Sequence, residues 1–280
     1  MSEENNLKQV KTITVRNVKI GDGIPKICIS VMGRKEADII VNAQLASEQA
    51  DIVEWRADFY EDIHDTDKVI ALAEKIRQAV KDVPLLFTIR SIREGGECQL
   101  SADEYEKINE AVIKSGFVDM ADVEIFTGIE AEPSNAEVYE ISESTASIIK
   151  NAKSAGVIVV ASNHDFDKTP SYNEIIKRLR TMKEAGADIP KIAVMPNSKK
   201  DVFTLLSATA AMSEDYADGP VISMSMSDKG VISRIIGEST GSAVTFASLG
   251  TPSAPGQVEA GLLRETLNIV HQAANSTGKK

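Results

Sequence analysis

A lysine lies inside a short apolar run in the second half of the chain. The run reads D-I-P-K-I-A-V-M-P from Asp188 to Pro196, and its length and aliphatic character predict a β-strand covered on both faces. A buried ammonium group is unfavourable unless it is paired or loses its proton, and a neutral lysine amine forms Schiff bases with carbonyl compounds. Lys191 is therefore a candidate nucleophile. The alternative is a lysine at a strand start whose amine extends to water.

A histidine ends the preceding apolar run, V-I-V-V-A-S-N-H-D-F. Histidine is the side chain that exchanges protons near neutral pH, so His164 is a candidate general acid and base. A histidine with a purely structural role is the alternative, but a neighbouring Schiff-base lysine favours catalysis. His64 lies in a charged loop and His271 in the last helical segment, and we expect both at the surface.

Polar and charged side chains alternate with apolar ones at the ends of several other apolar runs. For one arginine at a strand end, a surface ion pair is the simpler explanation. When five strands show the same alternation, we expect these side chains to share the interior of one barrel. They are Glu54, Arg56 and Asp58, then Thr88 and Arg90, then Asp122 and Glu124, then Ser162 and His164, and finally Lys191.

Two loops beyond these strands contain further candidates. Residues 90–97 read R-S-I-R-E-G-G-E, from which Glu94 could reach back to orient a histidine, unless the loop is simply solvated. Residues 248–257 read S-L-G-T-P-S-A-P-G-Q and follow the last predicted strand. Such a segment suits a closing lid with hydrogen-bond donors, although an ordinary turn has the same composition.

Eight apolar runs alternate with eight segments of helical spacing, which predicts an α/β fold of the (β/α)8 TIM-barrel type. A doubly wound open sheet is the alternative, but the first run ends M-G-R-K-E without a glycine-rich phosphate loop. The strands are expected at 26–32, 51–58, 84–90, 118–126, 157–162, 189–195, 220–226 and 242–249. The helices are expected at 36–49, 66–81, 101–115, 138–155, 171–185, 199–213, 230–237 and 257–273.

The N-terminal part precedes this alternation. Residues 1–9 are polar and are expected to be a flexible tail, and residues 10–25 contain alternating β-branched residues followed by G-D-G, which predicts a β-hairpin. No linker or low-complexity tract divides the chain, so we expect one barrel domain over 1–280. The connection from Thr127 to Asn135 is irregular and has no assigned role.

Composition narrows the possible partners. The net charge of −11 argues against nucleic acid as the main partner. No apolar run reaches the length of a membrane span, and the first residues lack a signal-peptide core. Cys28 and Cys98 provide neither a disulfide framework nor a metal-ligand spacing. We expect a cytoplasmic protein that acts on a small molecule.

Nine stretches between about residues 25 and 258 resemble the type I 3-dehydroquinate dehydratases, the Schiff-base enzymes of the shikimate pathway. In chain order they are PKICISVMGR, DIVEWRADF, LFTIRSIREGGE, SNHDF, IPKIAVMP, PVISMSM, ISRIIGE, SAVTF and SAPGQ. The resemblance covers most of the chain. It does not include the acidic N-terminal tail, and the connection at about 127–140 is longer than is usual in the family.

The resemblance implies a (β/α)8 barrel that forms a homodimer, uses no metal or other cofactor, and dehydrates 3-dehydroquinate to 3-dehydroshikimate. Lys191 would form the Schiff base, His164 would be the general acid and base, and Glu94 and Asp122 would orient or tune that histidine. Arg234 would bind the substrate carboxylate, with Ser253 and Gln257 from the lid. The ring hydroxyls would be held by Ser30, Glu54, Arg56 and Arg90, and the apolar walls would be Phe166, Met224, Met226 and Phe246.

Two other functions remain to be compared with this one. A class I aldolase or transaldolase shares the lysine and the barrel, but a phosphorylated substrate requires a phosphate site after the last strands, which S-A-P-G-Q matches poorly. A barrel that only binds a small acid would not explain a lysine and a histidine at neighbouring strand ends. Trapping a substrate adduct with borohydride distinguishes these functions most directly.

Overall fold

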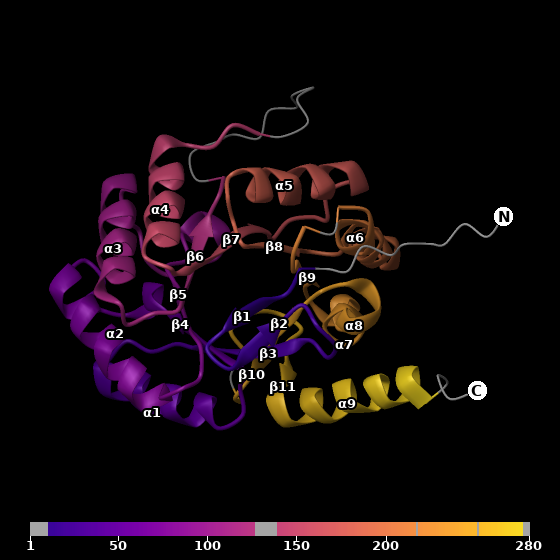
Figure 1. Cartoon of the computed structure of the whole chain (residues 1–280), viewed down its shortest axis with the longest axis horizontal. Coiled ribbons are helices and arrows are strands. Elements are labelled where there is room, and N and C mark those ends of the chain that lie inside the picture. Colours follow the sequence, from indigo (N-terminus) through magenta and orange to yellow (C-terminus); the bar gives the residue numbers. More distant parts are fainter. Residues whose placement is uncertain (1–10, 127–138, 217, 251, 277–280) are drawn as a thin grey trace.

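The computed structural model describes residues 11–126, 139–216, 218–250 and 252–276, and it shows a closed ring of parallel strands surrounded by helices (Figure 1). The predicted tail at 1–9 and the connection at 127–135 lie outside the described residues. The barrel strands are β3 (Lys26–Val31), β4 (Ile52–Arg56), β5 (Leu85–Thr88), β6 (Met120–Glu124), β7 (Ile158–Asp165), β8 (Ile189–Val194), β9 (Ile222–Ser225) and β10 (Val244–Ser248). Each lies within or overlaps one of the predicted runs.

The strands pair in chain order, so every neighbour along the chain is also a neighbour in space. The ring closes between β9 and β10 through a parallel bridge of Val221 with Ser242. At this seam the Ala243 N–H donates to the Val221 carbonyl over 2.8 Å, and the Ser223 N–H donates to the Ser242 hydroxyl over 3.1 Å. The (β/α)8 barrel prediction is confirmed.

Helices follow the strands along the chain. They are α1 (Glu36–Ser47), α2 (Thr66–Val80), α3 (Ala102–Ser115), α4 (Glu143–Ser154), α5 (Tyr172–Glu184), α6 (Lys199–Ala211), α7 (Ile232–Ile235), α8 (Gly237–Thr240) and α9 (Ala260–Ser276). Two predictions change in detail. In place of one helix at 230–237, the chain forms the two short helices α7 and α8, which span 232–240 and are interrupted at Ile236. The last helix begins at Ala260, because β11 (Val258–Glu259) first pairs with β10.

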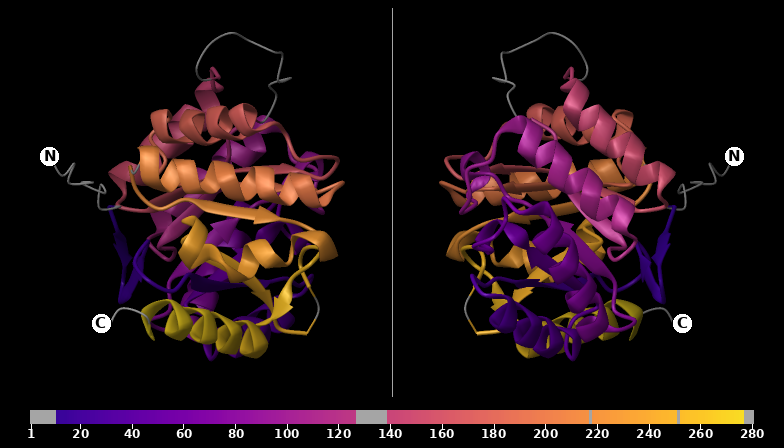
Figure 2. Two further views of the ribbon diagram at one scale, coloured as in Figure 1. Left: turned by 90° about the vertical axis from the view of Figure 1, so that its right-hand side faces the viewer. Right: turned by 90° about the vertical axis from the view of Figure 1, so that its left-hand side faces the viewer.

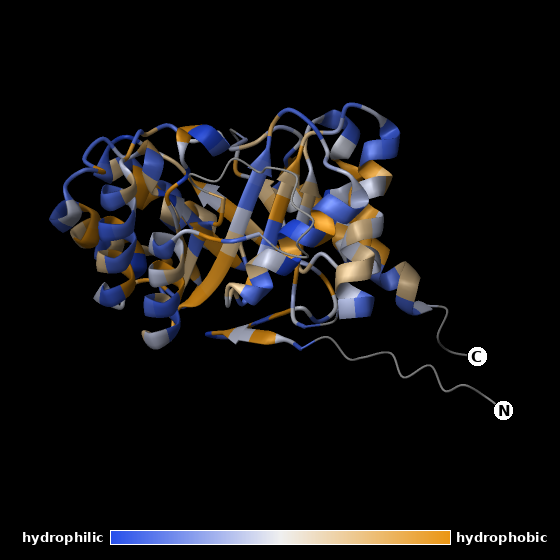
Figure 3. Cartoon of the chain, turned by 90° about the horizontal axis from the view of Figure 1, so that it is seen from above, coloured by the Kyte–Doolittle hydropathy of each residue, from blue (hydrophilic) through white to orange (hydrophobic). Residues whose placement is uncertain are grey.

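The predicted hairpin is present as β1 (Ile13–Val15) and β2 (Val18–Ile20), which pair antiparallel. Val15 and Ile20 are buried in the apolar cluster that fills the barrel interior at its amino-terminal end. Figures 2 and 3 show the hairpin across one end of the barrel, opposite the side to which the strands point. The hairpin closes the bottom of the barrel, so access to the interior is from the carboxyl ends of the strands.

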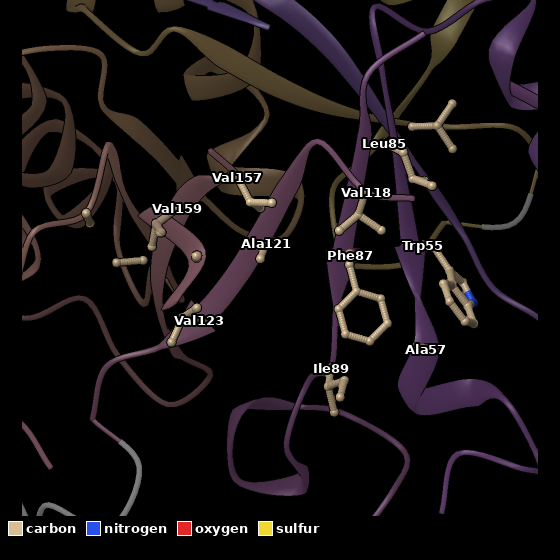
Figure 4. Packing of buried hydrophobic residues seen from close by; sticks show 14 of the residues in the cluster. Trp55, Ala57, Leu85, Phe87, Ile89, Val118, Ala121, Val123, Val157 and Val159 are labelled. Atoms are coloured by element: carbon tan, nitrogen blue, oxygen red, sulfur yellow. The ribbon is translucent and has the colours of Figure 1, made fainter. Parts of the chain in front are cut away.

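The two faces of the sheet differ as the alternation predicts. Side chains such as Trp55, Phe87 and Val123 point outward into the apolar layer beneath the helices (Figure 4). Trp55 and Phe87 pack edge to face with ring centroids 5.4 Å apart. The intervening residues therefore point into the barrel. Inside it, a layer of polar side chains lies above the apolar cluster that contains Val15 and Ile20.

Three aspartates repeat the same contact at the bottom of the barrel. Each directly precedes an even-numbered barrel strand. Its carboxylate accepts a hydrogen bond from one backbone N–H at the start of the preceding strand and also contacts a cationic side chain on a helix. Asp51 binds Ile27 N and Arg264, Asp119 binds Leu85 N and Arg77, and Asp188 binds Val159 N and Lys153. An unpaired buried N–H costs about 1–3 kcal/mol, so these contacts stabilise the strand starts far from the open end.

Among the described helices, none combines the length and apolar character needed to cross a bilayer.

Candidate active site

A pocket opens at the carboxyl ends of the strands and contains nearly all of the predicted site residues. Three of the four predicted catalytic side chains, Lys191, His164 and Glu94, line it, and the fourth, Asp122, lies directly beneath. The predicted binding residues in its wall are Ser30, Glu54, Arg56, Arg90, Phe166, Met224, Met226, Arg234, Phe246, Ser253 and Gln257. Residues from seven of the eight barrel strands or their following loops thus meet in one place.

Lys191 points inward from β8 and is 3% exposed. Its Nζ donates to Asp122 Oδ2 over 2.9 Å, and Glu54 Oε1 lies 3.9 Å away. The amine also lies 4.7 Å from the centre of the Phe246 ring. The lysine is therefore buried as expected, and the carboxylates give its ammonium form a partner until a substrate arrives.

Asp122 is a hydrogen-bond partner of Lys191 rather than of His164. Besides Lys191, it accepts hydrogen bonds from Arg90 over 2.9 Å and from Ser162 over 2.6 Å. In the sheet register Asp122 lies opposite Val160, four residues before His164. The expected role of Asp122 in orienting or tuning the histidine is therefore indirect, through Arg90, which donates to Asp122 and lies 3.6 Å from Glu94.

Opposing effects set the protonation of Asp122. Burial alone would raise the pKa of its carboxyl, but the adjacent charges of Arg90 and Lys191 outweigh burial and lower the pKa to about 2. Asp122 therefore remains an anion. It is suited to holding positive charge at Lys191, and it is a poor proton acceptor.

Arg90 connects three acidic side chains inside the barrel. Its guanidinium donates to Asp122 and Glu124, each over 2.9 Å, and lies 3.6 Å from Glu94. Glu124 also accepts the Ser91 N–H over 2.8 Å, which holds the start of the 90–97 loop over the pocket. These contacts of the Arg90 guanidinium hold the acidic side chains in place. Arg90 also lines the pocket, and its predicted contact with a ring hydroxyl of the substrate stays a prediction.

His164, which is partly buried, forms a pair with the buried Glu94. Glu94 Oε2 lies 2.8 Å from His164 Nδ1 and also accepts the backbone N–H of His164 over 3.0 Å. With Nδ1 facing Glu94, Nε2 is the ring nitrogen left for the pocket. This geometry agrees with the predicted role of Glu94 in orienting the histidine.

The environment keeps this pair from existing as a simple ion pair. Burial, together with the charges of Arg90 and Lys191, lowers the pKa of His164 well below its ordinary value. Burial and the charge of Glu124 raise the pKa of Glu94 to about 8. A neutral imidazole at the mouth of a buried site can accept a proton from a weak carbon acid and return it in a later step.

Arg234 has a buried charge that pairs with no acidic side chain among the described residues. Its guanidinium donates to the carbonyls of Pro255 over 3.1 Å and Phe246 over 3.5 Å, and its Nε is buried without a hydrogen-bond partner among the described residues. Burial lowers its pKa to about 10. An arginine held in a pocket by two carbonyl groups and the Met224 sulfur, 3.9 Å away, is prepared for an incoming anion.

The side of the pocket that was predicted to hold the ring hydroxyls consists of paired polar groups. Glu54 accepts hydrogen bonds from Ser30 and from Thr88, the latter over 2.9 Å. Arg56 is clamped by both oxygens of Asp58 over 2.7 and 2.8 Å, so its guanidinium has a fixed orientation. These groups offer a ring of donors and acceptors around the lysine.

The loop after β10 lies over Arg234. Gln257 accepts the Ser253 N–H and donates to the Ser253 hydroxyl, each over 2.8 Å. Across the pocket, Phe166 packs on Gly95, where a Cβ atom would lie 2.6 Å from the ring and where φ is +84°. Glycine is therefore required beneath Phe166, because both the backbone conformation and the ring exclude a side chain.

Asn163 is a site residue that the sequence reasoning missed. Strand alternation places it on the outer face, yet it is 7% exposed and its amide donates to Glu94 Oε1 over 3.2 Å. An asparagine next to a candidate catalytic histidine needs hydrogen-bond partners when it is buried, and that requirement was the available signal.

Comparison with known proteins is consistent with this site. The type I 3-dehydroquinase family model matches residues 27–274. The chain is 47% identical to the 3-dehydroquinate dehydratase of Bacillus licheniformis over 263 residues, covering 94% of this chain and 98% of that protein. It is also 47% identical to the 3-dehydroquinate dehydratase of Salmonella agona, over 94% of this chain and 100% of that protein.

The fold agrees as well. The crystal structure of the type I 3-dehydroquinate dehydratase of Clostridium difficile, which contains covalently modified comenic acid, superimposes with a TM-score of 0.87 at 43% identity. The alignment covers 94% of this chain and 99% of that one. A match that spans the whole barrel at this identity is decisive, and the chain belongs to the type I 3-dehydroquinase family.

Proposed function

We propose that this enzyme dehydrates 3-dehydroquinate to 3-dehydroshikimate through a Schiff base on Lys191. The observation that supports it best is the combination in one pocket of a buried lysine on a carboxylate, a neutral histidine, and an arginine to which the described part of the chain supplies no acidic partner. The substrate carries a ketone, a carboxylate and ring hydroxyls. Each of these groups has a complementary side chain in the pocket.

The first step is covalent. Lys191 Nζ attacks the ketone carbon, the carbonyl oxygen leaves as water, and a protonated imine forms. Asp122 stays ionised and lies 2.9 Å from Nζ, so it stabilises the positive charge that the imine carries. The imine then withdraws electrons from the neighbouring carbon and makes its proton removable.

The second step uses one histidine twice. His164 accepts the proton from the carbon next to the imine, and the electron pair moves into the imine to give an enamine. The enamine expels the hydroxyl group on the following carbon, and His164 returns the proton so that the group leaves as water. Hydrolysis of the remaining imine releases the product and regenerates Lys191.

The sheet register supports this division of work. Lys191 lies opposite Ser162 on β7, and His164 lies opposite Ala193 on β8. The histidine is thus one inward-facing position nearer the mouth than the lysine, on the neighbouring strand. With neighbouring strands about 5 Å apart, the two side chains reach adjacent carbons of one small ring.

Arg234→Ala should weaken substrate binding much more than it perturbs folding. A charge-assisted hydrogen bond to a carboxylate contributes about 1.5–3 kcal/mol, so we expect KM to rise about 10- to 100-fold. Removing the guanidinium also removes a buried charge that has no acidic partner within the described ranges, so the folded state does not depend on it. Steady-state kinetics and thermal unfolding of the variant measure the two effects.

A carboxamide analogue of the substrate provides the control for Arg234. The wild type should bind it as weakly as the variant binds the natural acid, and the variant should bind the two alike. If Arg234→Ala still prefers the acid by the wild-type ratio, the carboxylate is bound elsewhere, and Arg56 or Arg90 takes that role.

The activity itself is tested by following the conjugated ketone product in the ultraviolet after addition of 3-dehydroquinate. The competing aldolase-type function predicts cleavage of a carbon–carbon bond and release of two fragments instead. Mass spectrometry of the small-molecule products distinguishes loss of water from cleavage.

We also propose that the enzyme is a cytoplasmic homodimer, as the family resemblance implies. Phe203, Leu262 and Ile269 are large apolar side chains exposed on α6 and α9 of the single chain, and a partner chain would cover such groups. Sedimentation equilibrium at twice the mass of the chain, and cell fractionation, are the corresponding measurements.

A further inference from the structure

A line of hydrogen bonds runs from helix α5 to the catalytic histidine. Arg178 Nη1 donates to Asn163 Oδ1 over 2.9 Å, and Asn163 Nδ2 donates to Glu94 Oε1 over 3.2 Å. Glu94 Oε2 then contacts His164 Nδ1 over 2.8 Å. Neither Asn163 nor Arg178 lines the pocket around Lys191, but both line a neighbouring cavity that Glu94 and His164 also border.

Arg178 determines which way the Asn163 amide points. A guanidinium can only donate hydrogen bonds, so the amide oxygen must face Arg178 and the amide NH₂ must face Glu94. Arg178 is itself held by Glu174 over 2.7 Å and lies 3.6 Å from Asp165. Tyr139 donates to Glu174 over 2.8 Å. The orientation of the amide is thus set by a fixed cation.

This orientation restricts where Glu94 can carry a proton. Oε1 is occupied as an acceptor from Asn163, and Oε2 accepts the backbone N–H of His164. The proton that the pair exchanges therefore lies on the line between Glu94 Oε2 and His164 Nδ1. If the amide were reversed, its oxygen would attract that proton to Oε1, away from the imidazole.

The position of this proton decides what the imidazole offers to the substrate. When Glu94 is ionised, Nδ1 carries the proton and Nε2 has a free lone pair, so the ring is a base. When Glu94 is protonated and donates to Nδ1, the ring proton is on Nε2 and the ring cannot accept a proton from carbon. The protonation state of Glu94 therefore decides whether His164 can act as a base.

We propose that Asn163 and Arg178 are positioning residues that hold Glu94 in the orientation that leaves His164 Nε2 free to act as the base. The inference rests on the proposed function, because it concerns the same proton transfer. It assigns a catalytic task to a helix on the outside of the barrel and to an outward-facing strand residue. Arg178 acts by orienting Asn163, and Asn163 acts by its hydrogen bond to Glu94.

Several charged groups face the Glu94–His164 pair, and their effects give the sign of the expected change. Arg90 and the Asn163 amide stabilise the Glu94 carboxylate, whereas burial and Glu124 oppose it and raise the pKa to about 8. Removing the Asn163 donor raises this pKa further, so a higher pH is needed to ionise Glu94. The other charged groups around the Glu94–His164 pair are Asp122 on β6, Lys191 on β8, Arg56 on β4 and Arg178 on α5.

Asn163→Ala should therefore move the acid limb of the kcat–pH profile to higher pH by about one unit, which corresponds to one lost hydrogen bond to a charged group. At pH 7 this lowers kcat about tenfold, with KM changed less than about twofold. Arg178→Met should shift the limb in the same direction because the amide is released. Arg178→Lys retains a donor-only cation and should restore most of the wild-type midpoint.

The control variant is Arg180→Met. It removes a cation from the same helix, one that pairs with Glu184 over 3.3 Å rather than with Asn163. We expect its profile to match that of the wild type. If Arg180→Met and Arg178→Met lower kcat alike with unchanged midpoints, the helix has only a structural role and the proposal is wrong.

Two further measurements separate positioning from folding and from the choice of substrate. In a Glu94→Gln background, Asn163→Ala should cause no additional shift of the midpoint, and a full additional shift would show that Asn163 acts elsewhere. Nitrogen-15 spectra of the three histidines, with His164 identified by its loss in His164→Ala, report the Nδ1 and Nε2 protons directly. Their titration midpoint should rise in Asn163→Ala by the same amount as the kinetic one.

The spectra need no substrate, so they test the positioning role even if 3-dehydroquinate is not turned over. An unchanged nitrogen midpoint in both Asn163→Ala and Arg178→Met overturns the proposal. If Asn163→Ala does not fold, Arg178→Met decides the result alone.

Discussion

Lys191→Ala is expected to abolish both turnover and covalent capture of substrate while the barrel remains folded. No other amine is placed to form the imine within the pocket as the structure describes it. The fold should persist because Asp122 keeps Arg90 and Ser162 as partners after the lysine is lost. Breaking a buried ion pair costs about 3–5 kcal/mol when the remaining charge has no partner. In Lys191→Ala the remaining charge, that of Asp122, still has partners.

Borohydride trapping followed by peptide mass spectrometry is the measurement for Lys191. Wild-type enzyme incubated with 3-dehydroquinate and borohydride should carry the reduced product skeleton on the peptide that contains Lys191. Lys200, which lies on the outer helix α6, serves as the matched control, because Lys200→Ala should trap and turn over normally. An adduct on a different lysine in the wild type would remove the Schiff-base assignment.

His164→Ala is expected to capture substrate on Lys191 but to turn over at least about 100-fold more slowly, which is the lower range for loss of a general acid and base. Capture should survive because the lysine depends on Asp122, whereas the histidine depends on Glu94. The trapped adduct should then accumulate at a step before proton transfer. The measurement compares kcat with the yield of reduced adduct in the same preparation.

Near-normal turnover of His164→Ala would assign the proton transfer to another group, and Glu54 and Glu94 are the candidates because both line the pocket. Loss of both capture and turnover would instead indicate that the histidine is needed to form the imine. Asn275→Ala, at a surface site beside His271, provides a control for a change in a histidine contact far from the pocket.

The alternation of residue types along the chain determined more than the positions of the strands. In the run that contains Trp55, the polar neighbours Glu54 and Arg56 point into the barrel and the tryptophan points out. Side chains on a strand alternate strictly between the two faces, so a local pattern is enough to say which groups share the interior. For the same reason Lys191 could be recognised as an inward-facing buried amine before any fold was known.

Only the tertiary structure decided which of those groups are partners. Asp122 was expected to orient or tune the histidine, but the register between β6 and β7 sets it opposite Val160, where it hydrogen-bonds to Lys191 instead. Register depends on long-range pairing and barrel closure, which leave no local mark in the sequence. Asn163 was missed because the alternation rule sends it outward, where α5 happens to supply Arg178. A residue type and its local spacing therefore specify the face on which a side chain lies. The partner that it meets there depends on how separate segments are brought together in the barrel.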